Sequence, residues 1–136
     1  MIIDATDTIL GRLSSHCAKK ALNGEDIIIV NAEKAIISGR KTDILRKYKF
    51  KRNTGDVMKG PFISRMPDRI VRRTIRGMLP WSTSRGKVAF KKIQVHIGEP
   101  KNITGVRTKL EQYNKTTLNN PKYTTIADVS KWLGAK

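Results

Sequence analysis

The sequence predicts an α/β fold, in which helices and short strands alternate around a small sheet. A continuous β-branched run, Ile27–Val30, is typical of a strand buried on both faces of a sheet that helices cover. The apolar residues before it recur at helical spacing: Leu10, Leu13, Cys17 and Ala21. At 136 residues the chain is long enough to bury a core, and we expect residues 1–136 to form a single domain.

The N-terminal part is predicted to hold a strand, a helix and a second strand. Residues 2–3 begin the first strand, and either Asp7 or Thr8 can cap the helix that follows. Gly24 ends that helix just before the second strand. Another apolar run at residues 35–37 comes only four residues after the second strand, which is too short for a parallel crossover. Its place in the sheet therefore stays open.

The central part is predicted to hold a basic helix and a long basic loop. Residues 42–50 suit a helix, with Ile44, Leu45 and Tyr48 on one side and basic residues elsewhere. Residues 51–66 contain glycine and proline with little periodicity, which indicates a loop. Because long loops in compact domains are usually functional, this segment is a candidate binding element.

The next helix has the strongest pattern in the chain. It begins at Pro67, which suits a first helical position, and Asp68 lies beside the positive end of the helix. At about 100° per residue, four arginines fall within an arc of about 100°: Arg69, Arg72, Arg73 and Arg76. The opposite side is predicted to pack: Ile70, Val71, Thr74, Ile75 and Met78. One helix thus presents four guanidinium groups on one face and a packing surface on the other.

The C-terminal part is predicted to be less regular. Residues 83–92 suit a short helix and residues 94–97 a strand. Residues 99–124 are polar and loop-rich, so we expect them to wrap the surface or to reach a partner. Thr125, three residues before an acidic residue, resembles the start of a capping box, and it predicts a terminal helix at residues 125–134.

Positive charge is concentrated in the middle of the chain. The stretch from Arg40 to Lys92 holds 17 of the 28 basic residues and three acidic ones, a net charge of +14 out of +17 for the whole chain. A concentrated cationic face attracts polyanions, of which phosphate backbones are the commonest. A merely solvated face would mix charges of both signs, whereas the four arginines have a single acid nearby. Nucleic acid is therefore the predicted partner.

RNA is favoured over DNA by the shape of the basic region. Its loop is irregular and glycine-rich, as suits folded RNA, and the arginine helix has no evident helix-turn-helix partner. Phe62 and Trp81 lie inside the basic region. Both could stack on bases or serve as local packing anchors, and the sequence leaves this choice open.

Catalytic, cofactor and metal chemistry have little support in the sequence. The chain lacks both glycine-rich nucleotide-binding patterns, and His16, His96 and Cys17 offer no zinc spacing. Asp4 and Asp7 are explained by a strand end and a helix cap. We therefore predict no catalytic residue, no metal, no cofactor and no small-molecule substrate. The absence of an apolar run of about 18 residues, or of a leader pattern, argues against a membrane and for the cytoplasm.

Six short motifs, taken in order, make the chain resemble the large-ribosomal-subunit protein L13 family. They are D-x-x-x-x-x-LGRL at residues 4–13, VNAEK at 30–34, SGRK at 38–41, GPF at 60–62, RMP at 65–67 and RGMLP at 76–80. The resemblance covers nearly the whole chain. The direct passage from Gly24 into the second strand, without the extra residues of bacterial members, together with the short tail, resembles the archaeal branch.

The resemblance implies a three-layer α/β/α domain on a small, four-stranded, mostly parallel sheet. It also implies a structural protein of the large ribosomal subunit that binds large-subunit ribosomal RNA, contacts neighbouring ribosomal proteins and supports assembly of the subunit. The residues expected to bind RNA are Arg40, Lys41, Lys49, Lys51, Arg52, Lys59, Arg65, Arg69, Arg72, Arg73, Arg76, Arg85 and Lys87. Two alternatives remain, an RNA-modifying enzyme with an unrecognised site and a DNA-binding structural protein.

Overall fold

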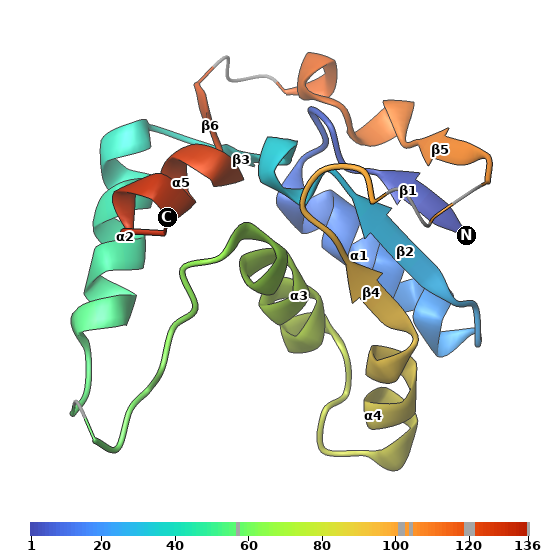
Figure 1. Ribbon diagram of the computed structural model, residues 1–136, viewed down its shortest axis with the longest axis horizontal. Coiled ribbons are helices and arrows are strands. Elements are labelled where there is room, and N and C mark those ends of the chain that lie inside the picture. Colours follow the sequence, from blue (N-terminus) through green and yellow to red (C-terminus); the bar gives the residue numbers. More distant parts are fainter. Residues whose placement is uncertain (57, 101–102, 104, 119–121, 136) are drawn as a thin grey trace.

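The computed structural model describes residues 1–56, 58–100, 103, 105–118 and 122–135 (Figure 1). The other positions of the predicted loop-rich segment lie outside the described residues. Helices and strands alternate along the N-terminal part of the chain, and the remaining helices gather around them in Figure 1.

The main sheet has four strands, all parallel, in the order β4-β2-β1-β5. Their bounds are β1 Ile2–Asp4, β2 Ile27–Val30, β4 Ile93–Val95 and β5 Arg107–Lys109. Helix α1, Leu10–Leu22, connects β1 to its neighbour β2, as a parallel pair requires. The predicted α/β class and small parallel sheet are confirmed. Strand β5 was not predicted, and it lies within the segment expected to be loop, which also holds two short 3₁₀ helices, Glu111–Tyr113 and Lys115–Thr117.

A separate two-stranded sheet gives the apolar run at residues 35–37 its place. Strand β3, Ile36–Ser38, pairs antiparallel with β6, Tyr123–Thr125, rather than joining the main sheet. Helix α2, Lys41–Asn53, and helix α5, Ile126–Trp132, lie beside this pair in Figure 1. The Thr125 side chain accepts a hydrogen bond of 3.2 Å from the backbone N–H of Asp128, so the predicted N-terminal cap of the last helix is confirmed.

The expected cap of α1 is wrong. The helix begins at Leu10 after Ile9, and no side chain caps it. The Asp7 carboxylate instead pairs with the Lys115 ammonium at 3.0 Å, and the Thr8 hydroxyl donates to the Thr6 carbonyl. A local side-chain cap does not form here, because this turn is held by residues distant in the sequence. The backbone N–H of Ile9 donates a hydrogen bond of 2.9 Å to the carbonyl of Tyr113.

Two helices follow the basic loop: α3, Pro67–Met78, lies near the centre of the view in Figure 1, and α4, Ser84–Lys91, lies at its lower right. Both agree with the predicted helices, and the strand after α4 begins one residue earlier and ends two residues earlier than expected. The predicted basic loop begins later, because α2 continues to Asn53. Met78 was placed on the packing side of α3 but is 42% exposed. The helix ends there, and the buried Leu79 takes the position against the core.

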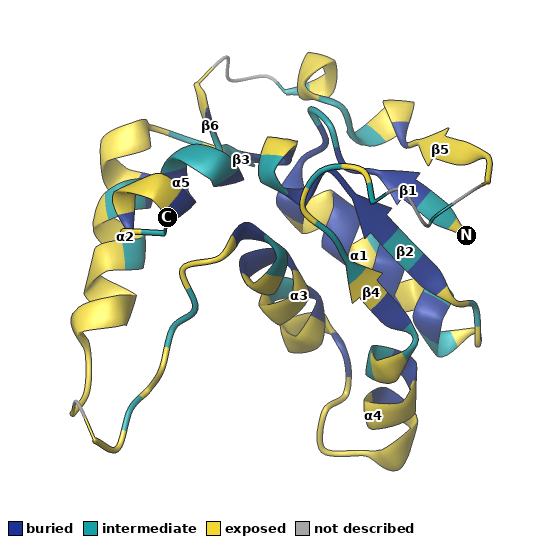
Figure 2. Ribbon diagram, viewed as in Figure 1, coloured by how far each residue is buried: buried dark blue, intermediate teal, exposed yellow. Residues whose placement is uncertain are grey.

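The core lies between the main sheet and its helices, as the dark blue segments of Figure 2 show. Ile3, Ile27, Ile29 and Ile93 of the sheet are fully buried, and α1 and α3 pack against each other over many residues. Cys17 of α1 is also fully buried, and burial raises the pKa of its thiol to about 12. A thiol held neutral in this way behaves as a small apolar side chain, as predicted, rather than as a nucleophile.

A buried carboxylate joins the ends of β1 and β2. Asp4 accepts hydrogen bonds from the Thr6 hydroxyl at 2.7 Å, the Thr6 backbone N–H at 3.0 Å and the Asn31 amide at 3.0 Å. Burial alone would raise the pKa of the Asp4 carboxyl, but the bonds from Thr6 and Asn31 and the charge of Lys109 lower that pKa below its ordinary value. The charged form of Asp4 is therefore the one that stabilises the fold.

Replacing Asp4 by Asn is expected to lower the free energy of unfolding at pH 7 by about 1–3 kcal/mol, because donors in the buried network lose their charged acceptor. Since the folded pKa is the lower one, this stabilisation is present above the unfolded pKa of about 3.9 and is lost as the pH falls through the folded pKa. Urea unfolding should thus show a smaller difference in the free energy of unfolding between the wild type and Asp4→Asn at pH 3 than at pH 7. The matched control is Asp7→Asn, which removes a half-exposed ion pair and should cost less than about 1 kcal/mol. If Asp4→Asn lost the same stability at both pH values, the conclusion that the charged form of Asp4 stabilises the fold would be contradicted.

Candidate nucleic-acid interface

All thirteen residues predicted to bind RNA are exposed. They lie on α2 and just before it, on the loop between α2 and α3, on α3 and on α4, elements whose outer sides are largely yellow in Figure 2. The four arginines of α3 form one exposed face, called here the arginine face: Arg69, Arg72, Arg73 and Arg76. The opposite side of α3 is buried through Ile70, Val71 and Ile75. The division of this helix into a packing side and a cationic side is as predicted.

Aromatic rings hold part of the arginine face in place. The guanidinium carbon of Arg72 lies 4.7 Å from the ring centre of Phe90, and that of Arg76 lies 4.3 Å from the ring centre of Trp81. The two rings meet edge to face, 5.2 Å apart and at 90°. A guanidinium stacked on a ring keeps its N–H groups free at its edge for phosphate oxygens. Trp81 thus serves as a packing anchor for the arginine face.

The basic loop is tied to the arginine face. Arg73 donates a hydrogen bond of 3.2 Å to the backbone carbonyl of Phe62. The Phe62 ring itself is 70% exposed. The loop is therefore held against α3 through its backbone, while its aromatic side chain stays accessible.

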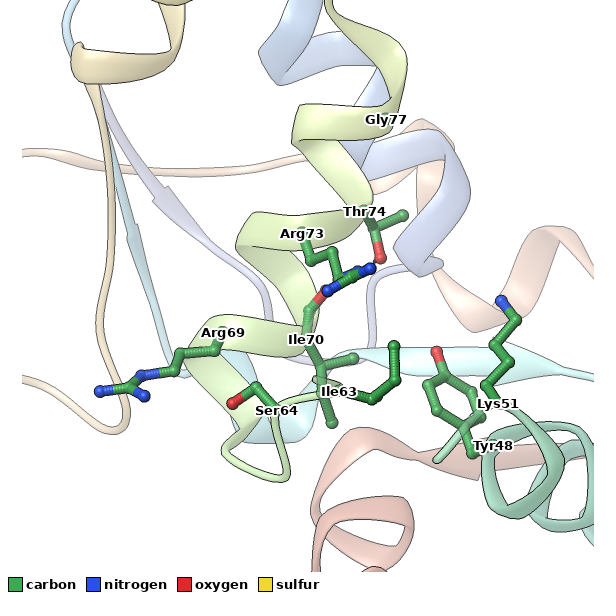
Figure 3. A pocket seen from close by; sticks show the side chains of 9 residues that line it. All are labelled: Tyr48, Lys51, Ile63, Ser64, Arg69, Ile70, Arg73, Thr74 and Gly77. Atoms are coloured by element: carbon green, nitrogen blue, oxygen red, sulfur yellow. Dashed lines mark hydrogen bonds between the residues drawn. The ribbon is translucent and has the colours of Figure 1, made fainter. Parts of the chain in front are cut away.

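A cavity of about 260 Å³ lies between α2 and α3, and Figure 3 shows the side chains that line it. Ile63 lies between Ile70 of α3 and Tyr48 of α2 in this view and gives the cavity an apolar floor. Burial raises the pKa of Tyr48, whose ring lies 5.9 Å from the Lys51 ammonium. Lys51 and the arginines of α3 make the rim basic. No carboxylate, histidine or cysteine is among the residues that line this cavity.

Several of the predicted RNA-binding residues also hold helix α5. Arg52 donates to the carbonyl of Leu133 and Arg65 to that of Gly134, while the Arg65 carbonyl accepts from Ser130 at 2.6 Å. Two other predicted RNA-binding residues contact this helix: Lys41 pairs with Asp128 at 3.7 Å, and the Lys49 ammonium lies 5.8 Å from the Trp132 ring. These cations therefore have a structural role that the sequence did not reveal.

Two more residues belong to this surface, and neither was among the residues predicted to bind RNA. Phe90 supports Arg72, but a single aromatic residue on a short helix carries no distinguishing signal. Gly77 lies in the last turn of α3, and a Cβ added there would meet nothing within 4 Å. A glycine inside a helical pattern was a usable signal, because glycine lowers helix stability relative to alanine. Its presence therefore points to a position where a larger side chain could interfere with an approaching group.

Among the described residues, no three His, Cys, Asp or Glu side chains come together where they could hold a metal ion. His16 meets the Tyr113 ring edge to face at 5.8 Å, and its pKa is lowered by burial and by the charge of Lys20. Asp4 and Asp7 bind different partners. In the part of the chain that the structure describes, no helix has the length and apolar character needed to cross a membrane.

The fold and the surface together define a class of protein. A small, strongly basic α/β domain, with a cationic face on a buried core and several of its acidic groups in internal contacts, is typical of structural ribosomal proteins. Comparison with known proteins agrees: the family model for Ribosomal protein L13 matches residues 1–102. The chain belongs to the ribosomal protein L13 family.

Three archaeal relatives show how far the similarity extends, each described as large ribosomal subunit protein uL13. The protein of Archaeoglobus fulgidus is 47% identical over 98% of this chain and 86% of its own length. Those of Methanocaldococcus jannaschii and Methanococcoides burtonii are each 45% identical over 99% of this chain and 98% of theirs. The resemblance to the archaeal branch is confirmed, and family membership makes this chain a structural component of the large ribosomal subunit rather than an enzyme.

Proposed function

We propose that this chain binds large-subunit ribosomal RNA through its basic central region and supports assembly of the subunit in the cytoplasm. Residues 1–136 act as one RNA-binding unit that also contacts neighbouring ribosomal proteins. The observation that carries this proposal is the arginine face: four exposed guanidinium groups on one side of a helix whose other side is buried.

The mechanism is that of a rigid cationic clamp. The core fixes α3, while Phe90 of α4, Trp81 between α3 and α4, and the backbone of the loop hold Arg72, Arg76 and Arg73 respectively. Each guanidinium can bind two phosphate oxygens, and its plane can stack on an exposed base. Because the cations are held in place before binding, little side-chain entropy is lost when RNA arrives.

Assembly of the subunit provides the functional test. Large subunits are reconstituted from ribosomal RNA and proteins with and without this chain, and particles are separated by sedimentation. We expect the chain to sediment with the completed subunit and its omission to leave slower, incomplete particles. Completed subunits formed at the same rate without the chain would contradict the assembly role. Turnover of RNA by the purified chain would favour the alternative of an RNA-modifying enzyme.

Gly77→Ala is expected to weaken RNA binding several-fold without lowering the unfolding temperature. The added methyl group meets no protein atom within 4 Å, and alanine is the better helix former, so the unfolding temperature should stay or rise by about 1–3 °C. On the RNA side, the methyl group would occupy space beside Arg73 and Arg76 where a sugar–phosphate backbone can approach the helix. Thermal unfolding and equilibrium RNA binding measure the two effects.

The matched control for Gly77→Ala is Gly11→Ala. Gly11 also lies near one end of a helix, α1, with nothing within 4 Å of an added Cβ, but it is outside the basic region. We expect its replacement to leave RNA binding unchanged. Equal binding by both variants would show that RNA does not come close to Gly77.

A further inference from the structure

We propose that a second cavity, between the arginine face, α4 and the basic loop, binds one unpaired nucleobase of the RNA. This inference rests on the proposed function and specifies which part of the RNA enters which part of the surface. The cavity has a volume of about 300 Å³ and is lined by the four arginines, Ser64 and two aromatic residues, Phe62 and Phe90. We call it the nucleobase pocket.

Phe62 supplies an aromatic wall that is both exposed and held in place. Its ring is 70% exposed. A Cβ added to Gly60 would lie 3.2 Å from ring carbons of Phe62, so the ring packs closely on the loop backbone where glycine has a φ of +88°. The hydrogen bond from Arg73 to the Phe62 carbonyl fixes the same residue against α3. An exposed ring on a backbone held in place suits stacking, because the ring is accessible to a base at a defined position beside α3.

Phe90 and Arg72 supply the opposite wall. The Phe90 ring is half-buried, with Trp81 against it edge to face at 5.2 Å and the Arg72 guanidinium 4.7 Å from its centre. Both Phe90 and Arg72 line the nucleobase pocket. A guanidinium plane supported by a ring is a surface on which nucleobases stack. The pocket thus offers π-stacking partners from two different elements, the loop and the α3–α4 pair.

Charge and size select the occupant. No acidic residue lines the nucleobase pocket, and its four arginines can bind the phosphates on either side of the base. Its volume is at the lower end of the roughly 300–1,000 Å³ of ligand pockets, which is enough for one nucleobase between the two walls. An apolar side chain of a neighbouring protein is a poorer match, because it would cover guanidinium groups without providing them with a partner.

The test compares two probes of equal charge. One is a ten-residue oligouridylate, and the other is a ribose–phosphate chain of the same length without bases. Because both carry the same phosphates, the ratio of their affinities isolates the contribution of the bases. For the wild-type chain at low salt, we expect the oligouridylate to bind about 5- to 100-fold more tightly, the range expected for stacking of a base on an aromatic side chain.

Three substitutions locate that preference on the protein. Phe62→Leu and Phe90→Leu should each reduce the ratio at least several-fold, and Phe62→Leu should fold normally because the side chain is exposed. Phe50→Leu is the matched control, since Phe50 is 73% exposed on α2 and does not line the nucleobase pocket. Its ratio should stay at the wild-type value.

Fluorescence gives an independent reading of the same site. In a Trp132→Phe background, Trp81 is the only tryptophan, and it touches the Phe90 ring. At saturation, the oligouridylate should change Trp81 emission more than the chain without bases does, because phosphates on Arg76 affect Trp81 in both cases and only the oligouridylate adds a base beside Phe90. Equal binding of the two probes by wild type, or an unchanged ratio in both Phe62→Leu and Phe90→Leu, would overturn the nucleobase pocket. Tight, selective binding of ribosomal RNA fragments in the same preparation would still support the proposed function, whereas its loss would overturn the proposed function itself.

Discussion

Replacing the four arginines of the arginine face together by Gln is expected to weaken binding to large-subunit ribosomal RNA by roughly 10²- to 10³-fold at 0.1 M salt. For irregular RNA, the slope of log K against log salt concentration is about −0.7 per neutralised phosphate. Loss of four contacts should therefore make the slope less negative by about 2.8. At 0.1 M, one decade of salt concentration below 1 M, a slope change of this size corresponds to the roughly 10²- to 10³-fold loss of affinity. Binding is measured by titration across a salt series.

The free energy of unfolding of this fourfold variant should fall by no more than about 1–3 kcal/mol, because all four side chains are exposed and the lost ring and carbonyl contacts are individually weak. The control is an equally charged variant in which four exposed lysines outside the central region are replaced by Gln: Lys19, Lys109, Lys122 and Lys131. This control should lose far less affinity. A similar loss in both variants would mean that total charge attracts RNA and that the arginine face has no special role.

Ile75→Ala is expected to have the largest effect on stability, lowering the free energy of unfolding by about 2–5 kcal/mol. Ile75 is fully buried on the side of α3 opposite the arginines, and it belongs to the core cluster that includes α1 and the main sheet. Truncation removes apolar contacts and leaves a cavity under the helix that carries the cations. Urea unfolding monitored by circular dichroism measures the loss.

Met78→Ala is the matched control on the same helix. Met78 is 42% exposed, and we expect its truncation to cost less than about 1 kcal/mol. If one side of α3 packs on the core and the other binds RNA, Ile75→Ala must lower the free energy of unfolding clearly more than Met78→Ala. Similar losses at both positions would contradict it.

Helix α3 shows why part of the structure could be predicted from the sequence. Its apolar and cationic residues follow the helical period on opposite sides, so that local pattern and tertiary packing favour the same arrangement. The same holds for the capped start of α5 and for the buried β-branched strand β2. In each case the information lies within a few neighbouring residues.

Strands β5 and β6 show what the sequence could not predict. The residues of β5 are all exposed and carry no apolar alternation, so its place at the edge of the sheet depends on backbone pairing with β1. Strand β6 pairs with β3, more than 80 residues away along the chain. The start of α1 likewise depends on a distant hydrogen bond from Ile9 to Tyr113. Such pairings are set by tertiary contacts that no local pattern records.

The candidate site was predictable in composition and less so in geometry. Charge concentration located the cationic region, and the thirteen residues expected there to bind RNA are all exposed. It could not show that Arg52 and Arg65 also hold the end of the chain, or that aromatic rings support Arg72 and Arg76. Those contacts join segments far apart in the sequence, and they distinguish a fixed surface from a merely charged one.

The most direct test of the central claim is equilibrium binding of the wild-type chain to large-subunit ribosomal RNA fragments and to duplex DNA across a salt series. About eight phosphate contacts predict selective binding of an RNA fragment, with a log–log slope near −5 to −6. Duplex DNA bound as tightly as every ribosomal RNA fragment would contradict the claim that this cationic surface is built for folded RNA.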